Sequence, residues 1–464
     1  MQMSLHIHSQ AFSGAVHDFF SPIAHLPWAM LLESGAPLSV DSRFHIISAE
    51  PLATLTTDGE LTYIDYQGER QITNDSPFAL VKHWQDKLIG KVSLPAEFAH
   101  LPFCGGAIGL FSYDLGRRLE QLPTRAINDQ LTPDMAVAIV DWAWVIDTQS
   151  QCAYLVVVGD EQALKARLLW WQQQQIKPGL PFSLTSGWQA SKSQAQYLHS
   201  FNQVQSYLAA GDCYQINLTL RFKATYTGDS WQAYCQLSAQ NQAPFSAFLQ
   251  LPSTTLLSVS PERFIALNDQ YVETKPIKGT RARSRDVLLD QQLATELQQA
   301  PKDRAENLMI VDLLRNDIGR VCVPGSVKVP SLFAIESFPA VHHLVSTITG
   351  ELDGALSAVD LLAATFPGGS ITGAPKVRAM EIIEELETHR RHAYCGSIGY
   401  ISAHGRMDTS ITIRTLVAKQ PSLYCWAGGG IVADSEAQSE YQELFDKLAK
   451  ILPVLSAISP VEGT

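Results

Sequence analysis

Two glutamates have side chains that could bind a metal ion, and a lysine lies near one of them. Glu306 and Glu443 both fall in segments with helical periodicity, and Lys447 follows Glu443 by one helical turn. Carboxylates on two helices suit Mg²⁺, which prefers oxygen ligands and takes only one or two carboxylates together with substrate. Each glutamate also has a structural interpretation. Asp303 and Glu306 have the spacing of a capping box, and Glu443 and Lys447 have that of an ordinary helical ion pair.

A triple glycine and an arginine could bind the carboxylates of a small substrate. Gly428, Gly429 and Gly430 lie between a predicted strand and a predicted helix start, where backbone N–H groups can converge on an anion. Arg414 lies in the alternating run 408–415, which predicts a strand with Arg414 and two hydroxyl side chains on one face. Its guanidinium fork could bind a carboxylate bidentately. The structural alternatives are a flexible turn for the glycines and a surface ion pair for Arg414.

Signatures of several common enzyme classes are absent from the sequence. Segment 366–376 has two glycines five residues apart, but no lysine follows the second, so it is not a phosphate-binding P-loop. Neither H-E-x-x-H nor G-x-S-x-G occurs, which excludes the commonest zinc-protease and serine-hydrolase motifs. No cysteine lies in a G-x-C-x-G elbow, so the sequence shows no thiol for hydrolysing glutamine.

The two helices that carry the glutamates are predicted at residues 302–321 and at about 435–452. In the first helix, apolar side chains cover nearly the whole circumference, which is typical of a buried helix. Its polar residues Glu306, Asp312 and Asn316 are then expected to be buried as well, and each needs a partner. The second helix has an apolar stripe with its charged residues along one edge.

The rest of the chain divides by composition into two parts. An amino-terminal part, 1–176, has many short runs that predict strands, followed by a helical stretch near 161–175. Segment 177–194 is rich in Pro, Gly, Ser and Thr, which favours a linker. In the part from 195 to 455, long helical patterns alternate with glycine-punctuated strands. Composition and periodicity alone indicate only a mixed α and β fold.

Composition and charge limit the classes of partner and compartment. The 464 residues are 46% hydrophobic and 17% charged, which is typical of a folded chain. The formal net charge of −12 argues against nucleic acid and anionic membranes as general partners. Seven scattered cysteines without a C-x-x-C pair favour reduced thiols in the cytoplasm. We expect no signal peptide and no membrane span, because no basic start precedes an apolar core and no apolar run approaches ~20 residues.

Five long segments together resemble a known family. They occur in order and read KPIKGTRAR from 275, ENLMIVDLLRNDIGR from 306, HHLVS from 342, FPGGSITGAPK from 366 and GGGIVADS from 428. This combination resembles the chorismate-binding enzymes, which include anthranilate synthase component I, aminodeoxychorismate synthases, and isochorismate and salicylate synthases. The resemblance covers nearly the whole chain. It implies an α/β (α+β) fold like that of anthranilate synthase component I, with two large, mostly antiparallel sheets in a sandwich and helices outside. The two parts of the chain would be interleaved into one body.

The resemblance also implies a role for each candidate residue. Glu306 and Glu443 would hold Mg²⁺, and Glu262 would be the general acid, although an ion pair with Arg263 is its structural alternative. Lys278 would be the nucleophile. The remaining residues of the substrate pocket would be Thr280, His343, Arg414, Gly428, Gly429, Gly430 and Lys447.

The lysine at position 278 is the residue that separates members of the family. Anthranilate synthases typically have alanine there, whereas lysine is typical of the aminodeoxychorismate synthases. The resemblance therefore implies amination of chorismate to 4-amino-4-deoxychorismate, for para-aminobenzoate and folate biosynthesis. Anthranilate synthase and an isochorismate synthase-type isomerase remain alternatives. Ammonia would come from a glutamine amidotransferase subunit in a heterodimer. Leu32, Glu33 and Ser34 resemble the segment that binds tryptophan in the family.

Overall fold

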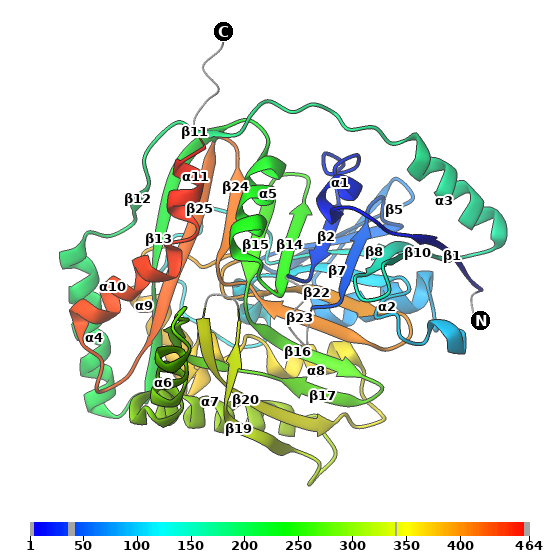
Figure 1. The fold of residues 1–464 in the computed structure, drawn as a ribbon. Coiled ribbons are helices and arrows are strands. Elements are labelled where there is room, and N and C mark those ends of the chain that lie inside the picture. The colour runs from blue at the N-terminus through cyan, green and yellow to red at the C-terminus, as the bar shows by residue number, and fades with distance from the viewer. Residues whose placement is uncertain (1–3, 36–41, 339–340, 459–464) are drawn as a thin grey trace.

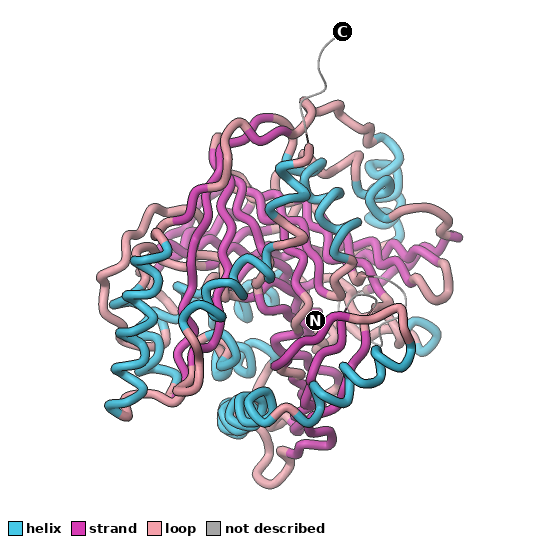
Figure 2. The backbone as a smooth tube through the Cα atoms, turned by 60° about the vertical axis from the view of Figure 1, so that its left-hand side comes forward, coloured by secondary structure: helices cyan, strands magenta, loops and turns pink. Residues whose placement is uncertain are grey.

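Two large β-sheets form the body of the protein, which a computed structural model describes over residues 4–35, 42–338 and 341–458 (Figure 1). Neighbouring strands within both sheets pair antiparallel, and helices lie on the outside of the strands (Figure 2). This arrangement confirms the predicted fold. None of the helices in the described ranges combines the length and the apolar character needed to cross a membrane.

The first sheet contains thirteen strands within the described residues. In spatial order they are β1 (Leu5–Ala11), β10 (Cys152–Val158), β9 (Trp142–Asp147), β3 (Phe44–Ser48), β2 (Ala29–Glu33), β14 (Phe245–Gln250), β15 (Thr255–Ser260), β24 (Thr415–Lys419), β25 (Ser422–Ile431), β13 (Gln215–Thr227) and β11 (Ser183–Leu184), with β12 (Gln189–Ala190) and β21 (Gly373–Ala374) also paired to β13.

The second sheet contains twelve strands within the same ranges. In order they are β18 (Ile277–Ala282), β20 (Val341–Glu351), β17 (Tyr271–Thr274), β16 (Arg263–Asn268), β23 (Met407–Ile411), β22 (Ser397–Ser402), β7 (Gly106–Phe111), β8 (Met135–Val140), β4 (Ala53–Asp58), β5 (Leu61–Tyr66) and β6 (Glu69–Thr73), with β19 (Lys328–Ser337) paired to β20.

Helices cover the outer faces of both sheets. The first sheet packs against α3, α4, α5, α9 and α10, and the second against α2, α6 and α7. The described helices are α1 (Val16–Phe20), α2 (Pro77–Leu88), α3 (Glu161–Gln173), α4 (Gln194–Ala210), α5 (Ser230–Asn241), α6 (Val287–Gln299), α7 (Pro301–Gly319), α8 (Ala358–Thr365), α9 (Lys376–Leu386), α10 (Ala437–Leu448) and α11 (Leu452–Ser456).

Strands from the two halves of the chain share both sheets. In the first sheet β2 pairs with β14, which places Leu32 opposite Ala247. In the second sheet β7 pairs with β22, which places Gly109 opposite Gly399. Alternate residues along a strand face opposite sides, so Met30 packs into the core between the sheets and Leu31 into the core under the helices. The backbone hydrogen bonds at these two junctions make the halves one continuous scaffold.

The prediction that helix α7 is buried on all sides is wrong. Leu308 is 52% exposed, and Asp312 and Asn316 are exposed. One face of α7 packs on β18, β20 and α8, and the other faces solvent. The helix begins at Pro301, so Asp303 lies within its first turn, and the predicted capping box of Asp303 and Glu306 does not form.

Candidate active site

Lys278 projects from a bulge in strand β18. Lys278 lies opposite Leu344 and Thr280 opposite His343, so Gly279 is an extra residue in this pairing. Gly279 has φ +77°, and a Cβ atom there would lie 2.8 Å from Leu297 and 2.9 Å from the Asp303 carboxyl carbon. The bulge therefore requires glycine, and it sets the direction of the strand at Lys278.

Glu262 and Lys278 converge on Ser370, which lies in the segment with the FPGGSITGAPK sequence. The Lys278 Nζ donates a hydrogen bond of 3.4 Å to the Ser370 carbonyl oxygen, and the Ser370 side chain is hydrogen-bonded to the Glu262 carboxyl. Glu262 is buried. Its neighbour Arg263 forms ion pairs of 3.0 Å with Asp408 and Glu273.

Burial favours the neutral forms of both groups. It lowers the pKa of Lys278, against the opposing charges of Glu306 and Glu262. It raises the pKa of Glu262, against the opposing charge of Lys278 and the hydrogen bond from Ser370. A neutral amine can attack carbon and a protonated carboxyl can donate a proton, so the pair is suited to nucleophilic and general-acid chemistry.

Glu306 and Glu443 bring two carboxylates to the same cluster from α7 and α10. Burial raises the pKa of Glu306, and the charges of Glu440 and Asp303 add to this rise. Burial also acts to raise the pKa of Glu443, but the attraction of Lys447 at 2.7 Å outweighs it, so this pKa is lowered. Lysines thus balance part of the negative charge of the cluster.

The two carboxylates fit a magnesium ion that shares its remaining ligands with substrate. Among the described residues, no group of three or more His, Cys, Asp or Glu side chains is placed to hold a metal. An octahedral Mg²⁺ bound by Glu306 and Glu443 would keep most of its positions for water and substrate oxygens. This donor set is typical of Mg²⁺ sites that assemble with an anionic substrate.

The triple glycine lies inside a strand, so the prediction that it stands between a strand and a helix start is wrong. Gly428 to Gly430 belong to β25, and helix α10 begins only at Ala437. The missing side chains let the Lys447 Nζ reach the Gly428 carbonyl oxygen at 2.8 Å. They also leave room for Gln215, whose Nε2 lies 2.5 Å from the position of a Cβ at Gly430.

Gln215 is a candidate substrate contact that the sequence did not reveal. It is fully buried, and neither polar atom of its side chain has a hydrogen-bond partner among the described residues. A buried amide without partners is costly, which favours a role in binding a ligand. Its only sequence signal is its alternation with Asn217 along β13.

Arg414 lies in a crossing between the sheets, so the prediction of a strand running through it is wrong. Strand β23 ends at Ile411 in the second sheet, and β24 begins at Thr415 in the first. The charge of Arg414 acts on both Glu262 and His343. Burial, reinforced by Arg414, lowers the pKa of His343 to about 4.

His343 and Thr280 form a pair across strands β20 and β18. The His343 Nδ1 lies 2.9 Å from the Thr280 hydroxyl. With its pKa lowered, His343 is a neutral hydrogen-bonding group near pH 7 and not a cation. The structure therefore brings the two catalytic candidates, the two metal candidates and the predicted pocket residues to one region where the sheets meet.

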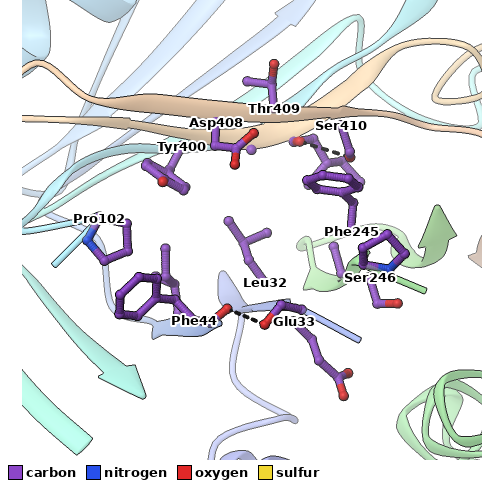
Figure 3. Close-up of a pocket in the computed structure, with 16 residues that line it drawn as sticks. Leu32, Glu33, Phe44, Pro102, Phe245, Ser246, Tyr400, Asp408, Thr409 and Ser410 are labelled. Carbon is purple, nitrogen blue, oxygen red and sulfur yellow. Dashed lines mark hydrogen bonds between the residues drawn. The ribbon is translucent and has the colours of Figure 1, made fainter. Parts of the chain in front are cut away.

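A cavity of about 110 Å³ lies between the sheets and is lined by Leu32, Glu33 and Ser34 (Figure 3). Phe44 and Tyr400 also line it, and the Glu33 side chain points away from Tyr400. The Glu33 Oε2 accepts three hydrogen bonds outside the cavity, from His17 at 3.0 Å, Tyr234 at 2.8 Å and Ser238 at 3.0 Å. A tryptophan amine would therefore need other partners, and tryptophan binding stays a prediction.

Comparison with known proteins identifies the family. The sequence profile described as chorismate binding enzyme matches residues 31–453. The chain belongs to the chorismate-binding enzymes. This match covers both halves of the chain and all the candidate site residues.

Individual members of the family are similar along nearly their full length. The protein named aminodeoxychorismate synthase component 1 from Escherichia coli (strain K12) is 55% identical over 441 residues, which is 95% of this chain and 96% of that protein. The Salmonella typhimurium protein of the same name is 54% identical over 94% of this chain and 95% of its own length. The crystal structure of anthranilate synthase component I from Streptococcus pneumoniae TIGR4 matches with a TM-score of 0.77 and 32% identity, covering 90% of this chain and 93% of that one.

Proposed function

We propose that this chorismate-binding enzyme is a transferase that converts chorismate and ammonia to 4-amino-4-deoxychorismate. The observation that carries the proposal is the Lys278 amine, which meets Glu262 at Ser370 with the neutral form of both groups favoured. The similarity to proteins named aminodeoxychorismate synthase component 1 supports it. The product would serve para-aminobenzoate and folate biosynthesis.

The reaction proceeds by two substitutions on the ring. The neutral Lys278 Nζ forms a bond to C2, both conjugated ring double bonds shift, and the C4–O bond breaks as Glu262 donates a proton and water leaves. Ammonia then forms a bond to C4, both double bonds shift back, and the C2–N bond to Lys278 breaks. Glu306 and Glu443 would hold Mg²⁺, whose charge neutralises the ring carboxylate.

The remaining residues hold the substrate and do not react. Arg414 and Lys447 are cations that both act on Glu262, and they are suited to the two carboxylates of chorismate. The backbone of Gly428, Gly429 and Gly430 passes close to the substrate because no side chain intervenes. His343 and Thr280 line the same pocket as neutral hydrogen-bonding groups.

Product analysis tests the proposed function directly. The purified chain is incubated with chorismate, Mg²⁺ and ammonium, and the product is identified by mass spectrometry. We expect a 4-amino species that keeps its enolpyruvyl group. Anthranilate with pyruvate would instead make the chain an anthranilate synthase, and isochorismate would make it an isomerase.

The nitrogen source gives a separate prediction: the isolated chain uses ammonium but not glutamine. The sequence has no thiol elbow, and all seven cysteines are free, which also fits the cytoplasm. We infer that a glutamine amidotransferase subunit supplies ammonia in a heterodimer. The assay compares ammonium with glutamine, with added amidotransferase as the positive control. Glutamine-dependent turnover by the pure chain would contradict this prediction.

The pH dependence of the rate should be a narrow bell. The reactive pair, neutral Lys278 with protonated Glu262, carries one proton in total, so the rate is highest between their two pKa values. Burial lowers the pKa of Lys278 and raises that of Glu262. The rising and falling limbs of the pH–rate profile should therefore lie closer together than they would for a free lysine and a free glutamate. In Glu262→Gln, only Lys278 must lose a proton, so the remaining activity should rise with pH without a decline. A decline at high pH in that variant would refute the assignment.

A further inference from the structure

Arg391 and Glu387 form a buried ion pair beside the active site. The Arg391 side chain is 1% exposed and that of Glu387 is 6% exposed. The pair is bidentate, with Nη2 to Oε1 at 2.7 Å and Nε to Oε2 at 3.0 Å. The guanidinium also lies over the Tyr113 ring at 4.8 Å. Such a pair is stable only if the remaining hydrogen-bonding atoms of both side chains also have partners.

The pair joins strand β13 to the turn that contains Ser370. The Arg391 Nη1 donates to the Ile371 carbonyl at 2.9 Å, and its Nη2 donates to the Asn217 carbonyl at 2.7 Å. The Glu387 Oε1 accepts the backbone N–H of Thr219 at 3.0 Å. One planar fork and one carboxylate therefore fix two backbone segments that are distant in sequence.

One segment leads to the reacting groups and the other to the triple glycine. Ile371 follows Ser370, whose carbonyl accepts from Lys278 and whose side chain bonds Glu262. The Ile371 carbonyl also accepts from the Asn217 side chain at 3.0 Å, so two donors hold it. On the other side, Asn217 and Thr219 pair with Gly430 and Gly428 of the triple glycine.

We propose that Arg391 and Glu387 are positioning residues that set the separation between Lys278 and the triple glycine, and thereby where the amine meets the substrate ring. The proposal rests on the proposed role of Lys278 as the nucleophile. Neither residue touches the substrate. Their effect on the rate passes through Ser370 on one side and through β13 on the other.

The test compares Glu387→Gln and Arg391→Lys with the control variant Glu384→Gln. Glu384 lies in α9, three residues before Glu387, which follows the end of that helix. Its side chain is as buried as that of Glu387, pairs with Arg117 and accepts the backbone N–H of Arg125. Within the described ranges, the hydrogen bonds of Glu384 go to Arg117 and to the backbone N–H groups of Arg125 and Ala126, and not to Ser370 or β13. The control therefore reports the general cost of breaking a buried ion pair. Chorismate consumption and product mass are followed over pH, and thermal unfolding is measured for each variant.

We expect kcat of Glu387→Gln to fall on the order of a hundredfold at temperatures where it stays folded, with a much smaller change in KM for chorismate. Its pH profile should broaden, because water admitted beside Lys278 and Glu262 returns their pKa values towards the ordinary ones. Arg391→Lys keeps the charge but loses the fork, and should behave alike. Glu384→Gln should lose stability while keeping the wild-type kcat and pH profile.

Two outcomes would overturn the proposal. Equal loss of kcat in Glu387→Gln and Glu384→Gln, or an unchanged pH profile in the folded variants, would leave the pair a purely structural one. A different product from the wild-type chain would refute the proposed function instead. The product is identified with the wild-type chain alone, so failure of the proposed function can be distinguished from failure of the proposed positioning role.

Discussion

Lys278→Ala should lower the rate of 4-amino-4-deoxychorismate formation by about a thousandfold or more, because it removes an amine held next to the reacting carbon. The Lys447 amine acts on the same cluster, but it is not available to replace Lys278. Lys447 is engaged with the Gly428 carbonyl and with Glu443. Without a nucleophile at C2, some ammonia should reach that carbon. The variant is expected to form traces of a 2-amino product or of anthranilate, which mass spectrometry can detect.

The matched control is Lys275→Ala, three residues earlier in the same segment. Lys275 pairs with Glu336 at 2.7 Å, outside the catalytic cluster. This variant should keep most of the activity, and both variants should keep the wild-type circular dichroism spectrum. Near-wild-type turnover by Lys278→Ala would show that the reaction needs no covalent intermediate.

Glu306→Gln and Glu443→Gln should each abolish Mg²⁺-dependent turnover. Charge stabilisation by a metal ion contributes several kcal/mol to the transition state, which corresponds to about a thousandfold in rate.

In the absence of metal, the Glu306→Gln and Glu443→Gln variants should differ in thermal stability. The raised pKa of Glu306 means that its charge destabilises the fold at neutral pH, so Glu306→Gln should unfold at a higher temperature. The lowered pKa of Glu443 means that its charge stabilises the fold at neutral pH, so Glu443→Gln should unfold at a lower temperature than the wild type.

Exposed carboxylates on the same two helices provide the controls. Asp312 on α7 is ion-paired with Arg315, and Asp446 on α10 accepts from Gln442. Asp312→Asn and Asp446→Asn should keep the Mg²⁺ dependence of kcat, and unfolding is measured in the presence of a chelator. Full activity of either glutamate variant at ordinary Mg²⁺ concentrations would refute the metal assignment.

Local patterns in the sequence predicted individual elements well. The short runs of the amino-terminal part predicted strands, and this part contains β1 to β10; the helical stretch near 161–175 is helix α3. The surroundings of each element were not predictable in the same way. The apolar residues of α7 suggested burial on every side, yet Leu308 faces solvent because no element covers that face. Hydrophobic periodicity shows which face of a segment can be buried, but it does not show which other elements will cover that face.

The residues of the candidate site also differ in how well the sequence could predict them. The resemblance to the family supplied Lys278, Glu262 and the metal candidates, and of these Lys278 and Glu306 lie inside the five long motifs. Gln215, Glu387 and Arg391 lie outside them. Their importance depends on contacts between residues far apart in the sequence, such as Arg391 with Asn217, and no pattern within one segment encodes those contacts.

The sharing of both sheets by the two halves of the chain restricts how genes of this family can recombine. A catalytic half taken alone would expose the edges of β14 and β22, and unpaired edges of this kind promote aggregation. Exchange of the amino-terminal half between relatives succeeds only if the incoming strands match the register of both edges, since a slip of one residue reverses every side chain. The two halves are therefore expected to be inherited together, and sequence drift on one side of each junction constrains drift on the other.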